Sequence, residues 1–157
     1  MTRTTTTLTI DDEQGTIALA TRLAAHLRAG DVVLLDGSLA AGKTFFTRAL
    51  VRAMGCDEDV TSPTYTIANI YDGPAFPILH VDAYRLKGTQ EFYHLGLDDY
   101  FETGVSLIEW GTRIEGFFDA PLSIHIGFGD TDTARTVTVA AGNARWDRVL
   151  TDLEAAP

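Results

Sequence analysis

The chain of 157 residues has one cysteine, few basic residues and no long apolar run. The single cysteine, Cys56, excludes an internal disulfide and suits a reducing compartment, so we expect a cytoplasmic protein. No stretch approaches the roughly 18 apolar residues that a membrane-spanning helix needs. The first ten residues, MTRTTTTLTI, lack the apolar segment of a secretory signal. We therefore expect neither secretion nor a role in a membrane.

Basic residues are scarce: 12 lysines and arginines stand against 22 aspartates and glutamates, which gives a net charge of −10. Direct binding of nucleic acid requires basic side chains that neutralise phosphates. The chain is therefore a poor independent binder of RNA, and an RNA-related function would need a partner protein that supplies the basic surface. The sequence also lacks an N-K-x-D motif, which disfavours a guanine-reading GTPase.

The strongest positive signal is a phosphate-binding loop at residues 37–44. The apolar run 32–35 leads into Gly37-Ser38-Leu39-Ala40-Ala41-Gly42-Lys43-Thr44, which fits the pattern G-x-x-x-x-G-K-[ST]. In this motif, backbone N–H groups and a helix N-terminus surround the phosphates, the lysine reaches the β- and γ-phosphates, and the threonine hydroxyl sits on Mg²⁺. We expect a triphosphate site here; the alternative is a glycine-containing turn without a ligand.

The remaining periodicity predicts a single α/β domain over residues 1–157, with flexible ends at 1–7 and 152–157. Strands are expected at 8–10, 32–35, 64–71, 78–84, 104–110, 122–126 and 135–139, with 64–84 forming a hairpin. Helices are expected at 15–29, 43–54 and 143–154, as two short pieces within 89–101, and weakly at 111–118.

A phosphate-binding loop also needs an acidic residue at the end of a neighbouring strand to hold Mg²⁺. Glu109 ends the most apolar run after the loop, and Asp82 lies within the run 80–85, HVDAYR. A buried carboxylate must be compensated, and a metal would do so; a salt bridge or a cap is the structural alternative for both residues. The pattern leaves open which carboxylate holds metal and which takes part in chemistry.

Three neighbouring residues have two interpretations each. Trp110 fits either core packing or stacking on a base. His80 alternates with Asp82 along a strand, so both side chains point the same way; this indicates either a shared site or a satisfied core histidine. Arg85 fits either a contact with the γ-phosphate or pairing with acidic loops.

Four sequence blocks occur in a fixed order: GSLAAGKTFFTRAL, SPTYTIANIY, LHVDAYRL with LGLDDYF close behind, and VSLIEW. Together they resemble the TsaE family (also called YjeE), the bacterial P-loop ATPases of tRNA threonylcarbamoyladenosine biosynthesis. The resemblance covers about residues 8–140. The loop alone is generic, whereas the combination of the other blocks is specific.

The resemblance implies a three-layer P-loop fold with a mixed, partly parallel sheet. It also implies binding of ATP and Mg²⁺, and ATP hydrolysis that is slow without partners. The implied partners are TsaB and TsaD, the subunits that transfer the threonylcarbamoyl group to adenosine. The tRNA would be contacted indirectly, through that complex.

The resemblance also implies roles for particular residues. Lys43, Asp82 and Glu109 would be catalytic, and Thr44 and Glu109 would hold the metal. Nucleotide contacts would come from residues 37–44 and from Glu13, Phe45, Thr64, Trp110 and Arg135, with Ser62-Pro63-Thr64 as a switch-like loop. Ala40 departs from the family, which usually has glycine there. If this position needs a positive φ, alanine is strained by about 1 kcal/mol or more.

Two other functions fit the residues. In a small-molecule kinase, Asp82 would accept a proton from a substrate hydroxyl, although the chain lacks an arginine-rich lid segment. A nucleotide-responsive binding module would bind ATP without useful turnover. The product of an incubation with ATP distinguishes the three functions.

Overall fold

The computed structural model describes residues 4–37, 42–57, 68–84, 86, 89–118 and 120–154. Its centre is a seven-stranded sheet with the strand order β1-β7-β6-β2-β5-β4-β3. The strands are β1 Thr4–Ile10, β2 Val32–Gly37, β3 Ala68–Asp72, β4 Pro77–Asp82, β5 Val105–Glu109, β6 Leu122–Phe128 and β7 Arg135–Ala141. The predicted α/β class and mixed, partly parallel sheet are confirmed.

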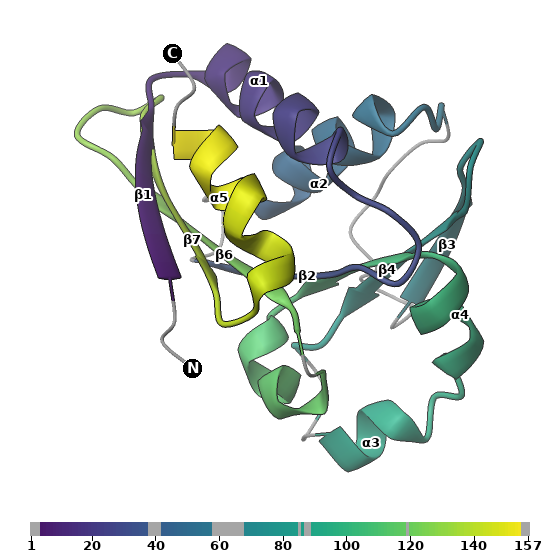
Figure 1. The fold of residues 1–157 in the computed structure, drawn as a ribbon. Coiled ribbons are helices and arrows are strands. Elements are labelled where there is room, and N and C mark those ends of the chain that lie inside the picture. Colours follow the sequence, from purple (N-terminus) through teal and green to yellow (C-terminus); the bar gives the residue numbers. More distant parts are fainter. Residues whose placement is uncertain are drawn as a thin grey trace.

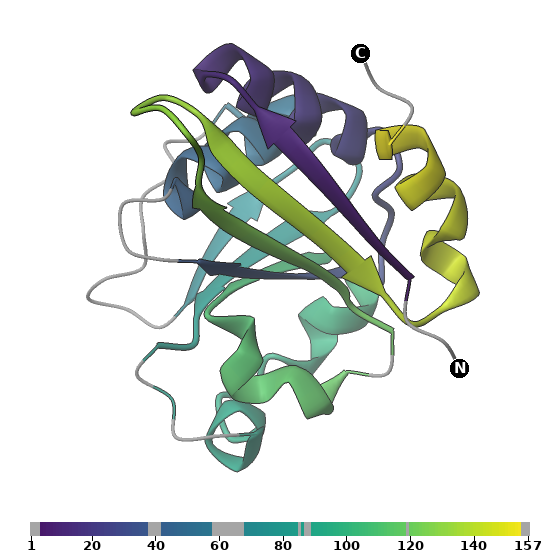
Figure 2. The ribbon, with the colours of Figure 1, turned by 90° about the vertical axis from the view of Figure 1, so that its left-hand side faces the viewer.

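The middle of the sheet is parallel. β6, β2, β5 and β4 run in one direction, whereas the outer pairs are antiparallel: β7 with β6, β1 with β7, and β3 with β4. Figure 2 looks onto the edge formed by β1 and β7. All five residues of β5 are buried, as expected for a parallel strand covered on both faces. This burial explains why 32–35 reads as a continuous apolar run and 105–108 as an apolar run that contains only the buried Ser106 as a polar residue.

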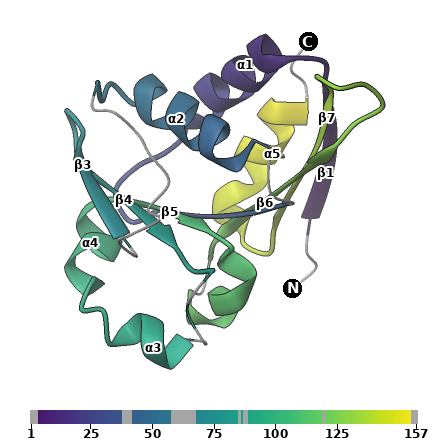
Figure 3. The same ribbon diagram turned by 180° about the vertical axis from the view of Figure 1, so that it is seen from behind.

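Helices cover both faces of the sheet (Figures 1 and 3). One face carries α1 Glu13–Ala24, α2 Lys43–Ala53 and α5 Asp147–Glu154, and the other carries α3 Thr89–Tyr93, α4 Asp98–Thr103 and the 3₁₀ helix η1 Gly111–Phe117. A short 3₁₀ turn, η2 Ala144–Trp146, leads into α5. Each face has its own apolar core: Leu23, Phe46 and Leu150 lie in the first, and Leu34, Phe92 and Ile108 in the second. The sheet therefore separates a layer of α1, α2 and α5 from a layer of α3, α4 and η1.

Several boundaries differ from the prediction. Helix α1 starts at Glu13 because the Asp12 carboxylate accepts the Gly15 N–H at 3.0 Å, a helix cap. It ends at Ala24 rather than 29, where the His26 N–H turns back onto the Leu23 carbonyl. The expected flexible ends overlap regular structure, because residues 4–7 pair with β7 and 152–154 form the end of α5.

The predicted hairpin is present as the antiparallel pair β3–β4. The described part of its first strand begins at Ala68, so the expected strand residues 64–67 lie outside the described residues. In the part of the chain that the structure describes, no helix has both the length and the apolar character needed to cross a membrane.

Candidate functional site

The predicted site residues on strands lie side by side at the carboxyl ends of the parallel strands. Glu109 is the register neighbour of Leu35 on β2 and of Asp82 on β4. Gly37 ends β2 two residues beyond Leu35. In open α/β sheets, ligands bind beyond the carboxyl ends of the strands. The topology thus brings Gly37, Asp82 and Glu109 to the edge where this fold class binds its ligands.

Glycine is required for different structural reasons at the two glycine positions of the loop. Gly37 has a φ of +148°, and a Cβ built there would lie 2.2 Å from the Ile126 carbonyl oxygen on β6. Gly42 has a φ of +108° and is the N-cap of α2, where it provides no side-chain cap. The first N–H groups of α2 therefore receive no side-chain acceptor from their cap residue and suit an anion.

Other predicted positions cannot be placed. Ser38, Leu39, Ala40 and Ala41 of the loop lie outside the described residues, as do Ser62, Pro63, Thr64 and Arg85. Their predicted roles, including the effect of Ala40, remain predictions. Thr44 and Phe45 are described, and both lie partly buried in the first turn of α2.

Lys43 is the first residue of α2 and is only 6% exposed. Its Nζ donates a hydrogen bond to the Gly37 carbonyl at 2.7 Å and lies 3.7 Å from the centroid of the Trp110 ring. Burial lowers the pKa of Lys43, while the negative charges of Glu109, Asp36 and Asp82 act in the opposite direction. The ammonium therefore lies within the field of the carboxylates at the strand ends.

Trp110 follows β5 with φ 59° and ψ 40°, the one non-glycine residue with a positive φ in the described chain. This left-handed conformation is unusual for a bulky residue. It is held by a hydrogen bond from the Trp110 N–H to the Leu35 carbonyl at 2.7 Å. Its ring also lies 5.0 Å from that of Tyr84. The turn directs the indole over Lys43, so Trp110 lies beside the predicted loop lysine as well as packing against the second core.

The two candidate carboxylates have different surroundings. Glu109 is 3% exposed, and its Oε2 lies 2.5 Å from Nε2 of the fully buried His80. Asp82 is partly exposed, and its Oδ1 accepts the Tyr84 N–H at 2.9 Å. His80 is absent from the predicted set of site residues, although its alternation with Asp82 was a signal for it. The structure joins it to Glu109 directly.

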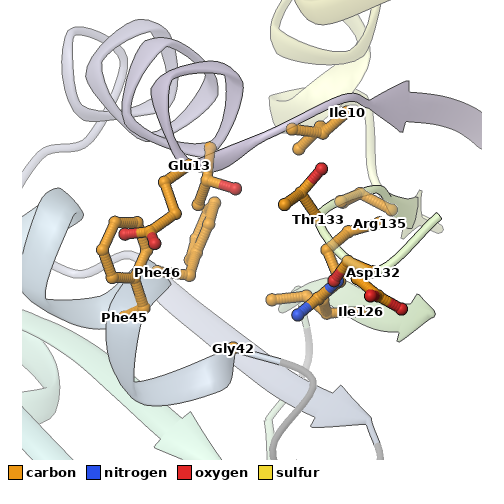
Figure 4. Close-up of a pocket in the computed structure, with 11 residues that line it drawn as sticks. Ile10, Glu13, Gly42, Phe45, Phe46, Ile126, Asp132, Thr133 and Arg135 are labelled. Carbon is orange, nitrogen blue, oxygen red and sulfur yellow. The ribbon is translucent and has the colours of Figure 1, made fainter. Parts of the chain in front are cut away.

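A cavity of about 230 Å³ lies beside Gly42. In Figure 4, Glu13 of α1 and Phe45 of α2 lie on one side of this cavity, and Arg135 lies across from them. The Thr133 hydroxyl donates to the Asp11 carbonyl at 2.8 Å, which ties the β6–β7 turn to the start of α1. Four predicted nucleotide contacts, Glu13, Gly42, Phe45 and Arg135, therefore line one cavity next to the loop.

The oxygen donors at this edge suit magnesium. Among the described residues, no group of three or more histidine, cysteine, aspartate or glutamate side chains gathers as a metal cluster. Mg²⁺ commonly takes one or two carboxylates and fills its remaining positions with substrate phosphates and water. The Thr44 hydroxyl in the first turn of α2 and the Glu109 carboxylate at the end of β5 are oxygen donors, the type of ligand that Mg²⁺ prefers.

Comparison with known proteins gives a consistent result. The family model described as "Threonylcarbamoyl adenosine biosynthesis protein TsaE" matches residues 10–137. The tRNA threonylcarbamoyladenosine biosynthesis protein TsaE of Streptomyces coelicolor is 44% identical over 137 residues, which cover 82% of this chain and 91% of that protein. The protein of the same name from Rickettsia felis is 34% identical over 151 residues, which cover 96% of this chain and 88% of that protein. The crystal structure of Bacillus subtilis YdiB matches with a TM-score of 0.81 and 32% identity over 98% of this chain and 96% of that one.

Proposed function

This chain belongs to the TsaE family of threonylcarbamoyl adenosine biosynthesis proteins, and we propose that it is the subunit that binds and hydrolyses ATP in support of that tRNA modification. One observation carries the proposal. The Lys43 ammonium and the Glu109 and Asp82 carboxylates lie together at the ends of parallel strands, at the N-terminus of α2. A cation and a helix N-terminus attract phosphates, and adjacent carboxylates suit a metal and a water molecule.

The triphosphate would bind at the N-terminal end of α2. The uncapped N–H groups after Gly42 would contact phosphate oxygens. Lys43 would exchange its contacts with the Gly37 carbonyl and the Trp110 ring for the β- and γ-phosphates. The cavity between Glu13, Phe45 and Arg135 would receive the nucleoside.

Hydrolysis would use the two carboxylates differently. Thr44 and Glu109 would hold Mg²⁺, which when bound offsets the negative charge of the phosphates. Asp82 is partly exposed and is the register neighbour of Glu109, so it would orient the attacking water through a hydrogen bond. The buried Glu109 is less suited to this exchange with solvent, which favours its role as a metal ligand.

The chain would work in a complex with TsaB-type and TsaD-type subunits. Its net charge of −10 supports contact with tRNA through these partners and not through its own surface. The reaction would be slow in the isolated subunit, and ATP hydrolysis would support turnover of the complex.

The proposal is tested with γ-labelled ATP and Mg²⁺, using the chain alone and together with TsaB and TsaD. We expect labelled free phosphate, released faster with the partners. A parallel reaction with Lys43→Ala should stay at the rate of the partners alone. Label transferred to a metabolite would instead identify a small-molecule kinase, and ATP binding without phosphate release would identify a binding module.

A further inference from the structure

A buried chain of hydrogen bonds leads from the β3–β4 hairpin to the proposed metal ligand. The Tyr71 hydroxyl lies 3.2 Å from Nδ1 of His80, and Nε2 of His80 lies 2.5 Å from Oε2 of Glu109. All three residues are buried, and His80 is 0% exposed. The chain thus joins three strands, β3, β4 and β5, in the interior of the sheet layer.

The strand register explains this meeting. Asp82 pairs with Glu109 across the parallel β4–β5 ladder, and His80 pairs with Leu107. Residues two apart on a strand share a face, so His80 lies one step deeper than Asp82 on the face that carries Glu109. From there its ring reaches Glu109 from the protein interior, away from the open end of the strands.

With Glu109 ionised and His80 neutral, the donors and acceptors of the three groups define the direction of each hydrogen bond. An ionised carboxylate only accepts hydrogen bonds, so His80 must donate to Glu109 from Nε2. In a neutral imidazole the other nitrogen is then an acceptor, and Nδ1 accepts from the Tyr71 hydroxyl. Tyr71 therefore favours the one tautomer of His80 that can hold Glu109. Partners of this kind orient metal-binding side chains in many proteins.

We propose that His80, oriented by Tyr71, is a positioning residue that holds the Glu109 carboxylate for its work at the nucleotide site. Because His80 engages Oε2, the carboxylate would turn Oε1 toward a bound metal and its water. The carboxylate then stays in one rotamer instead of turning both oxygens toward the ligand. This inference rests on the proposed function, since it assigns Glu109 the role of a metal ligand.

The test compares two substitutions of similar size. In His80→Gln, the amide N–H₂ reaches about as far as Nε2, so donation to Glu109 is retained. In His80→Asn, the shorter amide reaches only about as far as Nδ1, so donation to Glu109 is lost. Loss of such a partner typically lowers metal affinity or activity by about 10- to 100-fold. We expect His80→Asn to lower kcat and raise the half-saturating Mg²⁺ concentration by such a factor, with KM for ATP unchanged and with His80→Gln close to wild type.

A second readout does not depend on hydrolysis. In the ligand-free protein labelled with ¹⁵N-histidine, two-bond ¹H–¹⁵N spectra report which ring nitrogen carries the hydrogen. The His80 signals are those that disappear in His80→Gln. We expect the hydrogen on Nε2 in wild type, and a mixture of tautomers in Tyr71→Phe. A hydrogen on Nδ1 with none on Nε2 in wild type would overturn the inference.

Failure of the inference and failure of the proposed function can be told apart. If wild type with its partners hydrolyses ATP and His80→Asn is as active and as sensitive to Mg²⁺, His80 does not position Glu109. If wild type releases no phosphate, the proposed function fails, and the tautomer measurement still tests the chain of hydrogen bonds. Should His80→Asn melt below the assay temperature, Tyr71→Phe replaces it, with an expected loss in kcat of about 3- to 10-fold and no change in KM.

Discussion

The Lys43 ammonium lies 3.7 Å from the centroid of the Trp110 ring and donates to the Gly37 carbonyl at 2.7 Å. The contact has the geometry of a cation–π interaction. Trp110 reaches this position only because its backbone adopts the left-handed conformation after β5. The loop lysine is thus held by protein groups at the place where the proposed function needs a phosphate, and nucleotide binding must exchange these contacts.

This exchange predicts a change in tryptophan fluorescence on nucleotide binding. The chain has two tryptophans, and the other one, Trp146, is fully buried with its Nε1 donating to the Ala120 carbonyl at 2.9 Å. We expect ATP to alter the emission of wild type as the ammonium leaves the Trp110 ring. Trp110→Phe should abolish the change, with ATP affinity within about threefold, because phenylalanine keeps a ring over the lysine. A nucleotide-dependent signal that persists in Trp110→Phe would contradict the exchange.

Lys43→Ala is expected to weaken ATP binding by about 100-fold or more. Removing one partner of a buried charged pair typically costs about 2–5 kcal/mol, and here the lost partner would be the cation at the phosphates. Calorimetry with a non-hydrolysable ATP analogue measures the effect. Arg52→Ala is the matched control, because it removes one positive charge from the exposed last turn of the same helix. Equal affinity of Lys43→Ala and wild type would refute the loop assignment.

Glu109→Gln and Asp82→Asn should fail in different ways. Both variants keep the size of the side chain, and we expect each to lower ATP hydrolysis by about 100-fold, within the usual range for loss of a group that assists proton transfer or charge stabilisation. Only Glu109→Gln should raise the Mg²⁺ concentration needed for half-maximal rate, because Asp82 is proposed to orient water and not metal.

Titrating Mg²⁺ against the rate at saturating ATP distinguishes these roles. Asp98→Asn, at the exposed start of α4 on the opposite layer, controls for the change of net charge. A shift in Mg²⁺ dependence in Asp82→Asn but not in Glu109→Gln would reverse the two assignments. Wild-type hydrolysis in Asp82→Asn would remove that residue from the mechanism.

Local patterns were sufficient for the elements that carry the site. The apolar run before Gly37 and the glycine pair predicted the strand that ends at Gly37 and the start of α2 at Lys43, whereas residues 38–41 between them lie outside the described residues. The position of Glu109 at the end of β5 was predicted because a buried parallel strand reads as an apolar run that ends in a carboxylate. The two short helices α3 and α4 were anticipated as two pieces within 89–101, and the chain turns between them at Gly96, which has a φ of +71°. In each case the signal lies within a few residues of the feature.

Local patterns could not predict contacts between segments that are far apart in the sequence. Glu13 and Arg135 meet at one cavity because β1 pairs with β7 and β7 with β6, and only the family resemblance pointed to them. The contact of His80 with Glu109 depends on the parallel register of β4 and β5, which no local periodicity specifies. The strand at Thr4–Thr7 was missed for a similar reason, because its pairing with β7 overrides a run of threonines with no apolar alternation.

Gly37→Ala is expected to destabilise the fold at the entrance to the loop. The added Cβ would lie 2.2 Å from the Ile126 carbonyl oxygen, on a backbone with φ +148°. Backbone strain of this kind costs about 1–3 kcal/mol, and the displaced β6 backbone adds to it. For a chain of this size, a total of about 3 kcal/mol lowers the melting temperature by about 6–12 °C. Calorimetric melting measures the shift.

Gly142→Ala is the control for the loss of a glycine, because no atom lies within 4 Å of a Cβ built there. Its melting temperature should stay close to that of wild type, since surface substitutions usually change stability by less than about 0.5 kcal/mol. If Gly37→Ala and Gly142→Ala both have the melting temperature of wild type, the close approach to β6 does not require glycine at position 37.

The acid stability of the fold should depend on Asp152 at the end of α5. Its carboxylate accepts a hydrogen bond from Nε2 of His26 at 2.8 Å and lies 3.4 Å from the Arg22 guanidinium. The hydrogen bond from His26 lowers the pKa of Asp152, and the charge of Arg22 acts in the same direction. Because its pKa is lower in the folded state, the ionised carboxylate stabilises the fold at pH values above the unfolded carboxyl pKa of about 4. That contribution is lost as the pH falls through the folded value.

Asp152→Asn should therefore have a lower free energy of unfolding than wild type at pH 5. This difference should disappear as the pH approaches 2. Urea unfolding of wild type and variant at a series of pH values measures the difference in free energy of unfolding. Asp130→Asn makes the same change of charge in the exposed β6–β7 turn and should show a smaller pH-dependent difference. If the free-energy difference between wild type and Asp152→Asn is the same at pH 5 and at pH 2, the ionised carboxylate does not stabilise the contact between α1 and α5.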